Sequence, residues 1–208
     1  MILYDYWRSS SSYRVRIALH LKGEPFDVKP INLVAGEQHA PAYLKMNPQG
    51  LVPALDLENG TVLTQSLAII EYLDECCAGA PLFPKEPEAR AIVRAMANII
   101  ACDIHPLNNL RTTKYLSNDL KISDEEKDAW YKKWLLDGFT ALEAMTQDND
   151  AFLYGNSPTL ADVCLIPQMY NAQRFNIDVS HYKNIIKVCN NCSNMSEFHL
   201  SRPDRYRP

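Results

Sequence analysis

Residues 9–12, four consecutive serines, are the part of this chain whose residue type and position most directly suggest chemistry. They follow an apolar and aromatic run, residues 2–6, that predicts a strand, and they lead into a helical pattern in which Val15 and Leu19 share a face. Serine is favoured at a helix start because its oxygen caps unpaired backbone N–H groups. The same position attracts anions, a thiolate included, because the helix dipole is positive there. The serines are therefore either a helix cap or an anion holder.

The composition is that of an ordinary globular protein and argues against several classes of function. The chain has 208 residues, enough for one large domain or two small ones. Its formal net charge of −4 argues against a nucleic-acid partner, which would require a clustered basic excess. No apolar run reaches the roughly 18 residues of a membrane span, and no secretory signal precedes the first strand. We therefore expect a cytoplasmic protein with no membrane partner.

The cysteines do not suggest a metal site. Cys189 and Cys192 have CxxC spacing, but neither a second cysteine pair nor a histidine pair accompanies them. The pair also lies late in the chain, whereas a redox motif of this spacing is expected after a first strand. The six cysteines are therefore predicted to be reduced thiols, with no metal bound.

Residues 1–80 alternate between strand and helix signals. The order is β-α-β-α-β-β-α, which predicts a compact α/β unit with a mixed sheet. Asn59-Gly60 is the strongest hairpin signal and joins the last two strands. The predicted strands are residues 2–6, 26–33, 51–57 and 61–64, and the predicted helices begin near Ser12 and cover 41–46 and 67–77.

Residues 81–87 are rich in proline and predict a linker to a second, all-helical domain, residues 88–208. A long helix over 88–117 is interrupted only by Pro106. Capping-box patterns at Ser123 and at Thr159 open two further helices, the first covering residues 124–146. A shorter helix over 182–190 and a polar tail, 201–208, complete the chain.

Six blocks spread along essentially the whole chain match a known pattern: residues 8–19, 30–33, 47–53, 65–73, 104–111 and 171–175. Together they resemble the zeta class of glutathione transferases, whose members include maleylacetoacetate isomerases and bacterial maleylpyruvate isomerases. The resemblance implies an α/β thioredoxin-like N-terminal domain, an all-α C-terminal domain, glutathione as cofactor and a homodimer. Ser11 departs from the pattern, because the class often has cysteine there, so chemistry that requires a protein thiol at this position is absent.

The resemblance also assigns residues to glutathione. Val52 precedes the position of a family cis proline, Pro53, and a cis bond would turn the Val52 backbone towards the ligand; an edge-strand proline would explain the residue equally well. Gln65 and Ser66 open a helix that suits the γ-glutamyl carboxylate, although an ordinary cap has the same appearance. His39, in a loop, is assigned more weakly to the glycyl end, since a loop histidine is often simply solvated.

The thiol of glutathione is assigned to the serines. Ser9 is the first candidate to donate a hydrogen bond to the sulfur and favour its ionised form, and Ser10 and Ser11 could share or replace it. A thiolate can add to the double bond of a cis-enedioic acid, allow rotation and leave with the trans isomer. The resemblance therefore implies conversion of maleylacetoacetate to fumarylacetoacetate in tyrosine and phenylalanine breakdown.

The substrate and the transient enolate are negative, so cations and donors should face the thiol. His105 and Asn109, four residues apart on one predicted helix, are assigned as such donors on the glutathione side. The planar guanidinium of arginine binds both oxygens of a carboxylate. The candidates for the substrate carboxylates are Arg8, Arg111 and Arg174.

The remaining residues near the serines are given structural roles. Arg14 and Arg16 lie inside the predicted helix and are expected to form ion pairs, and Tyr4, Tyr6 and Trp7 are expected to be core. Three other functions stay open: maleylpyruvate isomerisation in gentisate breakdown, transferase activity on small haloacids, and a glutathione-binding protein without enzymatic activity.

Overall fold

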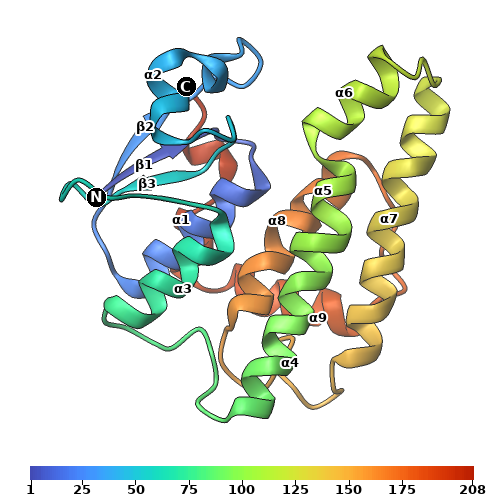
Figure 1. Ribbon diagram of the computed structural model, residues 1–208. Helices are drawn as coiled ribbons and strands as arrows, with labels where there is room; N and C mark the ends of the chain where they lie inside the picture. Colours follow the sequence, from blue (N-terminus) through green and yellow to red (C-terminus); the bar gives the residue numbers. More distant parts are fainter. The chain divides into compact units, whose positions relative to one another are not determined.

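The computed structural model describes residues 1–208, and the chain divides into two compact units. The first unit consists of Met1–Pro81 together with Asn194–Pro208, and the second consists of Leu82–Ser193 (Figure 1). None of the helices combines the length and apolar character of a membrane span.

The first unit is built on a four-stranded mixed sheet with the order β2-β1-β3-β4. β1 (Ile2–Asp5) pairs in parallel with β2 (Asp27–Pro30) and antiparallel with β3 (Ala54–Asp56). β3 also pairs antiparallel with β4 (Val62–Thr64), across the predicted hairpin. The predicted element order and the mixed sheet are therefore confirmed.

Three helices accompany this sheet: α1 (Ser10–Lys22), α2 (Pro41–Met46) and α3 (Ser66–Cys76). A short 3-10 helix, Glu37–His39, precedes α2. α1 and α3 pack against each other. α1 begins at Ser10, earlier than the predicted start near Ser12, because Ser9 acts as the N-cap.

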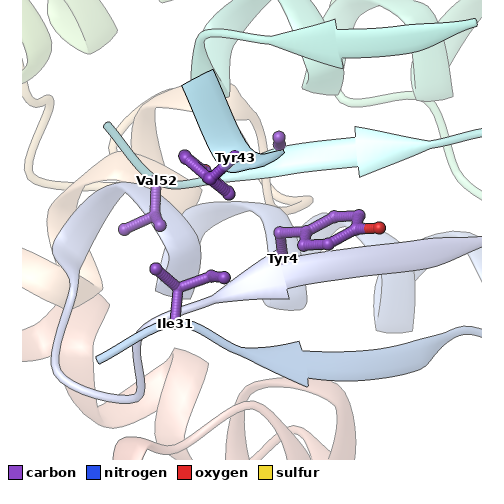
Figure 2. Packing of buried hydrophobic residues seen from close by; sticks show 5 residues of the cluster. Tyr4, Ile31, Tyr43 and Val52 are labelled. Atoms are coloured by element: carbon purple, nitrogen blue, oxygen red, sulfur yellow. The ribbon is translucent and has the colours of Figure 1, made fainter. Parts of the chain in front are cut away.

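A cluster of buried side chains joins the strands to α2. Tyr4 and Tyr43 meet edge to face, with ring centroids 6.1 Å apart. Figure 2 shows the cluster, which consists of Tyr4, Ile31, Tyr43, Val52 and Ala54. The Tyr43 hydroxyl donates a hydrogen bond of 2.7 Å to the carbonyl of Leu51. The core therefore holds the segment that leads into β3.

The predicted domain boundary at the C-terminus is wrong. Residues 194–208, including α10 (Ser196–Leu200), belong to the first unit and not to the helical domain. The reason is a contact between residues far apart in sequence: Arg16 Nε donates to the Ser201 carbonyl over 3.1 Å. The predicted linker, residues 81–87, is also too long. Leu82 and Phe83 are buried and already belong to the second unit.

The second unit is entirely helical, as predicted for this region. Both predicted capping boxes are present, at Ser123 with Glu126 and at Thr159 with Asp162. Its elements are α4 (Pro87–Asn98), the π-helix η2 (Ile99–Ile104), α5 (His105–Asn108), α6 (Leu110–Asn118), α7 (Asp124–Met145), α8 (Leu160–Arg174) and α9 (Lys183–Ser193). A 3-10 helix, Pro203–Arg205, lies near the end of the chain in the first unit.

The interruption in the predicted helix 88–117 lies at a different residue. Pro106 sits in the first turn of α5, after a π-helical segment, and the chain leaves the helix at Asn109, with φ −67° and ψ 149°. Proline has no N–H to donate within a helix, which favours an irregular ladder around it. Asn109 then starts α6, because its side-chain oxygen accepts a hydrogen bond of 3.0 Å from the Arg111 N–H.

Gly138 on α7 provides a test of the packing in this unit. A methyl group at Gly138 would overlap the side chain of Ile104, which is fully buried and has little room to move. The Gly138→Ala variant should therefore lose about 1–3 kcal/mol of unfolding free energy, although alanine favours helix by about 1 kcal/mol. Urea denaturation measures this value. A variant at least as stable as the parent would show that Ile104 repacks.

Candidate active site

The serine run forms the N-terminus of α1. Ser9 is the N-cap, and its side-chain oxygen accepts a hydrogen bond of 3.2 Å from the Ser12 N–H. The Ser9 N–H in turn donates to the Tyr6 carbonyl over 2.8 Å, which closes the turn between β1 and α1. The predicted cap is thus confirmed. A hydroxyl oxygen that accepts one hydrogen bond can still donate its own proton, so the cap and an anion-holding role are compatible.

Ser10 and Ser11 lie in the first turn of α1, where backbone N–H groups point along the helix axis. Ser10 is buried, whereas Ser9 and Ser11 are partly exposed. A ligand anion at this end would therefore meet Ser9 and Ser11 more readily than Ser10.

Arg8 stands next to the cap and is exposed. Its Nη2 donates to the Tyr6 hydroxyl over 3.1 Å, and its guanidinium lies 4.8 Å from the ring centroid of Trp7. The assignment of three aromatic residues to the core is right for Tyr4 and wrong for Trp7. Tyr6 packs at the edge of the core cluster. Trp7 is only partly buried because the chain turns away from the sheet after Asp5.

The Val52–Pro53 peptide bond is cis, as the family pattern implied. The segment before it is held by two hydrogen bonds to the Leu51 carbonyl, from Tyr43 and from the side-chain amide of Asn47, each 2.7 Å long. Val52 itself is buried. These contacts hold the backbone next to the cis bond in place.

Gln65 and Ser66 lie at the start of α3. Gln65 is the N-cap residue, with φ 67°, and its amide donates to the side-chain oxygen of Gln49 over 2.6 Å. Ser66 is buried in the first turn. The hydrogen bond between the two glutamines links this helix start to the turn that precedes the cis bond.

Arg14 adds a positive charge beside Ser66. Its side chain is only 1% exposed, and its Nη1 donates to the Ser66 hydroxyl over 3.5 Å. A buried guanidinium behind a helix N-terminus increases the positive potential that a carboxylate would meet there. The sequence predicted only an ion pair for Arg14 and did not predict this contact with Ser66. The available signal was the place of Arg14 among the largely apolar residues 13–19 in the middle of α1.

His39 is exposed and closes the 3-10 helix before α2. Its ring lies against Gly50, where a Cβ would come within 3.0 Å of His39 Nδ1. Gly50 has a φ of 64°, so both its backbone and this close approach favour glycine. The structure therefore brings His39 to the turn that leads to Val52.

In the second unit, three predicted residues meet at the junction of α5 and α6. His105 Nε2 and Asn109 Nδ2 are 3.3 Å apart, and Asn109 also caps the helix that contains Arg111. His105 and Asn109 are neighbours, as their spacing of four residues predicted, although α5 ends at Asn108 and the predicted helix does not continue through Asn109. Arg111 is exposed in the first turn of α6.

Arg174 is the last residue of α8 and is exposed. Its guanidinium lies 4.4 Å from the ring centroid of Phe175, which in turn packs on Tyr131 with centroids 4.2 Å apart. Burial raises the pKa of Tyr131 to about 12, so this hydroxyl stays neutral. The two rings help to line a cavity of about 200 Å³, whose other lining residues are Asp128, Ala129, Lys132, Asn176 and Ile177.

The predicted residues thus fall into groups within each unit. Arg8 and the serines gather at the start of α1, while Ser66, Gln65, Val52, Pro53 and His39 surround the start of α3 and the cis bond. His105, Asn109 and Arg111 gather in the second unit.

Cys189 and Cys192 lie in α9, and burial raises the pKa of Cys189 to about 12, which makes this thiol a poor nucleophile.

Comparison with known proteins identifies the family. Residues 8–76 match the family described as glutathione S-transferase, N-terminal domain. The chain is 43% identical to the maleylacetoacetate isomerase of Rhizobium meliloti (strain 1021), over all of this chain and 98% of that protein. It also resembles a solved maleylpyruvate isomerase described as a bacterial zeta-class transferase, with 40% identity, a TM-score of 0.94 and coverage of 98% and 97%. The chain belongs to the zeta-class glutathione transferases.

A further relative of this zeta-class chain was solved with ligands. The maleylacetoacetate isomerase of Methylobacterium extorquens AM1, with bound malonate and GSH, has a TM-score of 0.95 and 36% identity, over 100% of this chain and 98% of that one. The predicted family and the thioredoxin-like and all-helical architecture are confirmed. The helix N-termini at Ser9 and Ser66 offer N–H groups and positive potential, which suits the anionic groups of glutathione.

Proposed function

We propose that this chain is a glutathione-dependent isomerase that converts maleylacetoacetate to fumarylacetoacetate. The observation that carries the proposal is the start of α1, where Ser9 caps a helix N-terminus next to the exposed Arg8, in a chain of the zeta class. Bound glutathione would supply a thiolate that adds reversibly to the substrate double bond and so permits its rotation.

Each candidate site residue has a proposed role in this reaction. Ser9 donates a hydrogen bond to the sulfur and keeps it ionised, with Ser10 and Ser11 as the alternatives. Ser66, supported by Arg14, receives the γ-glutamyl carboxylate at the start of α3. The remaining glutathione contacts are assigned to His39, Val52, Pro53, Gln65, His105 and Asn109, and the substrate carboxylates to Arg8, Arg111 and Arg174.

The family also suggests where the protein acts, in which oligomeric state and in which pathway. We propose a cytoplasmic homodimer that acts in tyrosine and phenylalanine breakdown. A second candidate function is isomerisation of maleylpyruvate, favoured by the 40% identity to the solved maleylpyruvate isomerase. Both substrates are dianionic cis-enedioic acids, so the same arginines would serve either.

A direct assay separates these functions. The purified protein should isomerise maleylacetoacetate only when glutathione is present, and S-methylglutathione should not replace it, because its sulfur cannot ionise. A kcat/KM higher for maleylpyruvate than for maleylacetoacetate would favour the second candidate. If neither acid is turned over, the isomerase proposal fails.

The Arg174→Ala variant tests the carboxylate assignment. We expect kcat/KM to fall roughly 30-fold, equivalent to about 2 kcal/mol, because a charge-assisted hydrogen bond to the dianion is lost. Steady-state kinetics with saturating glutathione measure the effect. The matched control is Arg202→Ala, since Arg202 is also exposed and is assigned no role in binding. Kinetics like those of the parent would remove Arg174 from the site.

A further inference from the structure

We propose that the end of the chain is a clasp that positions the start of α1 for catalysis, with Arg16 as the positioning residue through which it acts. The C-terminal clasp is defined as Ser201, Tyr206 and Arg207. The proposal rests on the proposed role of Ser9 and extends it to residues that do not touch the ligand.

Arg16 ties together the strand, the turn and the helix that present Ser9. Its side chain is fully buried, at 0% exposure. Nη1 lies 2.7 Å from both carboxylate oxygens of Asp5, the last residue of β1, and Nη2 donates to the Trp7 carbonyl over 3.1 Å. Since the turn from Tyr6 closes on the Ser9 N–H, the position of the cap depends on where Arg16 holds this turn.

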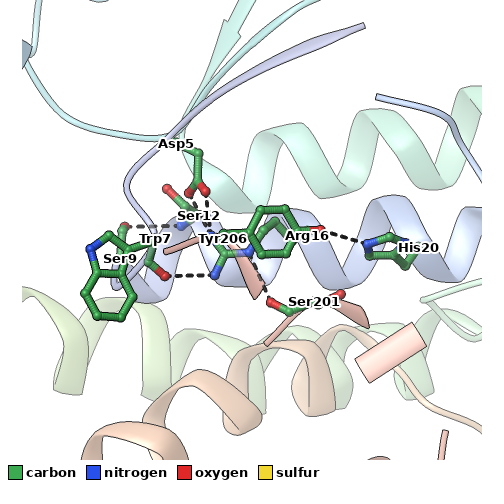
Figure 3. A network of polar contacts seen from close by, with 8 residues as sticks. All are labelled: Asp5, Trp7, Ser9, Ser12, Arg16, His20, Ser201 and Tyr206. Atoms are coloured by element: carbon green, nitrogen blue, oxygen red, sulfur yellow. Dashed lines mark hydrogen bonds and ion pairs between the residues drawn. The ribbon is translucent and has the colours of Figure 1, made fainter. Parts of the chain in front are cut away.

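The clasp completes the surroundings of the Arg16 guanidinium. Nε donates to the Ser201 carbonyl over 3.1 Å, and the Tyr206 ring centroid lies 4.5 Å from the guanidinium carbon. Figure 3 shows Arg16 between Asp5 and these clasp residues. A buried N–H without an acceptor is unfavourable, so the clasp and the Asp5 ion pair together fix one orientation of Arg16.

The clasp also reaches the turn directly. The Arg207 guanidinium lies 5.5 Å from the Trp7 ring centroid, and Arg8 lies against the same ring at 4.8 Å. The Tyr206 hydroxyl also lies 3.0 Å from Nε2 of His20 on α1 (Figure 3). The clasp therefore contacts Arg8 through the Trp7 ring. It acts on Ser9 through Arg16, which holds the turn before Ser9.

Variants of the C-terminal residues should behave differently if these residues only stabilise the fold than if they position Ser9. Loss of a structural tail lowers the folded fraction but leaves the chemistry of each folded molecule unchanged. Loss of the clasp should alter the hydrogen bond from Ser9 to the sulfur, which is read in the thiol pKa and in kcat. The KM for glutathione should change little, since Ser66 and Val52 are held by other contacts.

The test compares the double variant Tyr206→Leu/Arg207→Ala with Tyr206→Phe, which keeps the ring over Arg16. The pKa of bound glutathione is titrated by ultraviolet thiolate absorbance, and kcat and KM are measured on the same samples. We expect the double variant to raise the thiol pKa by about one unit and lower kcat about tenfold, with KM within about twofold. Tyr206→Phe should stay near the parent.

Arg16→Lys and Arg202→Ala complete the design. Arg16→Lys keeps the charge but loses the planar set of donors, so it should resemble the double variant, and Arg202→Ala should resemble the parent. An unchanged thiol pKa and kcat in the folded double variant would overturn the clasp. If Ser9→Ala also leaves the thiol pKa unchanged, the role of Ser9 itself has failed; if only Ser9→Ala raises it, the clasp alone has failed.

Discussion

Replacing Ser9 with alanine should lower kcat/KM for isomerisation about 100-fold and raise the pKa of the bound glutathione thiol. The hydroxyl of Ser9, the proposed donor to the sulfur, also caps the helix by accepting a hydrogen bond from the Ser12 N–H. Its loss removes stabilisation of the thiolate and loosens the helix N-terminus that supplies the dipole. The pH dependence of kcat/KM measures both consequences.

The stability effect of a lost cap has to be separated from the catalytic effect. Ser123→Ala is the matched control, because the Ser123 side chain likewise accepts a hydrogen bond from the N–H three residues on and carries no proposed catalytic role. Each cap variant should lose about 1 kcal/mol of unfolding free energy, but only Ser9→Ala should lose activity. Ser9→Thr keeps a hydroxyl and should retain most of the rate. A pH–rate profile unaltered in Ser9→Ala would move the role to Ser10 or Ser11.

Replacing Asp162 with alanine should give the largest loss of stability. Its carboxylate is fully buried and accepts hydrogen bonds of 2.8 Å from the Leu153 N–H and 2.8 Å from the Thr159 N–H, and one of 2.9 Å from the Thr159 hydroxyl. The variant leaves these donors without an acceptor, and each buried donor left unpaired costs about 1–3 kcal/mol. We expect a loss of about 4 kcal/mol by urea denaturation at neutral pH.

The contribution of Asp162 should also depend on pH. Burial raises the pKa of Asp162 to about 6, from an ordinary value of 3.8, although the hydrogen bonds oppose the shift. A carboxyl whose pKa is raised by folding stabilises the native state fully below its unfolded value and loses that contribution as the pH rises through about 6. The parent should therefore lose up to about 3 kcal/mol between pH 4 and 7 relative to Asp162→Ala.

Parallel urea titrations of the parent and of Asp162→Ala across this pH range test the sign. Thr159→Ser is a suitable control, since it keeps the hydroxyl that donates to Asp162 and should show the same pH dependence as the parent. A gap between the parent and Asp162→Ala that widens as the pH rises would contradict the raised pKa of Asp162 in the folded protein.

Much of the fold could be predicted because its signals are local. The Asn59-Gly60 hairpin and the capping boxes at Ser123 and Thr159 depend on residues within one turn of each other. The prediction for 88–117 failed at Asn109, because a proline within a helix shows that the ladder is disturbed and not where it ends. The start of α1 was placed late because any of four successive serines could act as the cap.

The family, the element order of the first unit, the serine run at a helix start and the absence of a cysteine at position 11 could all be predicted from the residues alone. These features are written in residue types and short spacings. The folded structure was needed to show that Arg14 reaches Ser66 and that Arg16 joins β1 to the end of the chain. A buried guanidinium binds the carboxylate, carbonyl or ring that the fold places beside it. Because Arg16 and Ser201 are far apart in the chain, no local sequence pattern indicates their contact.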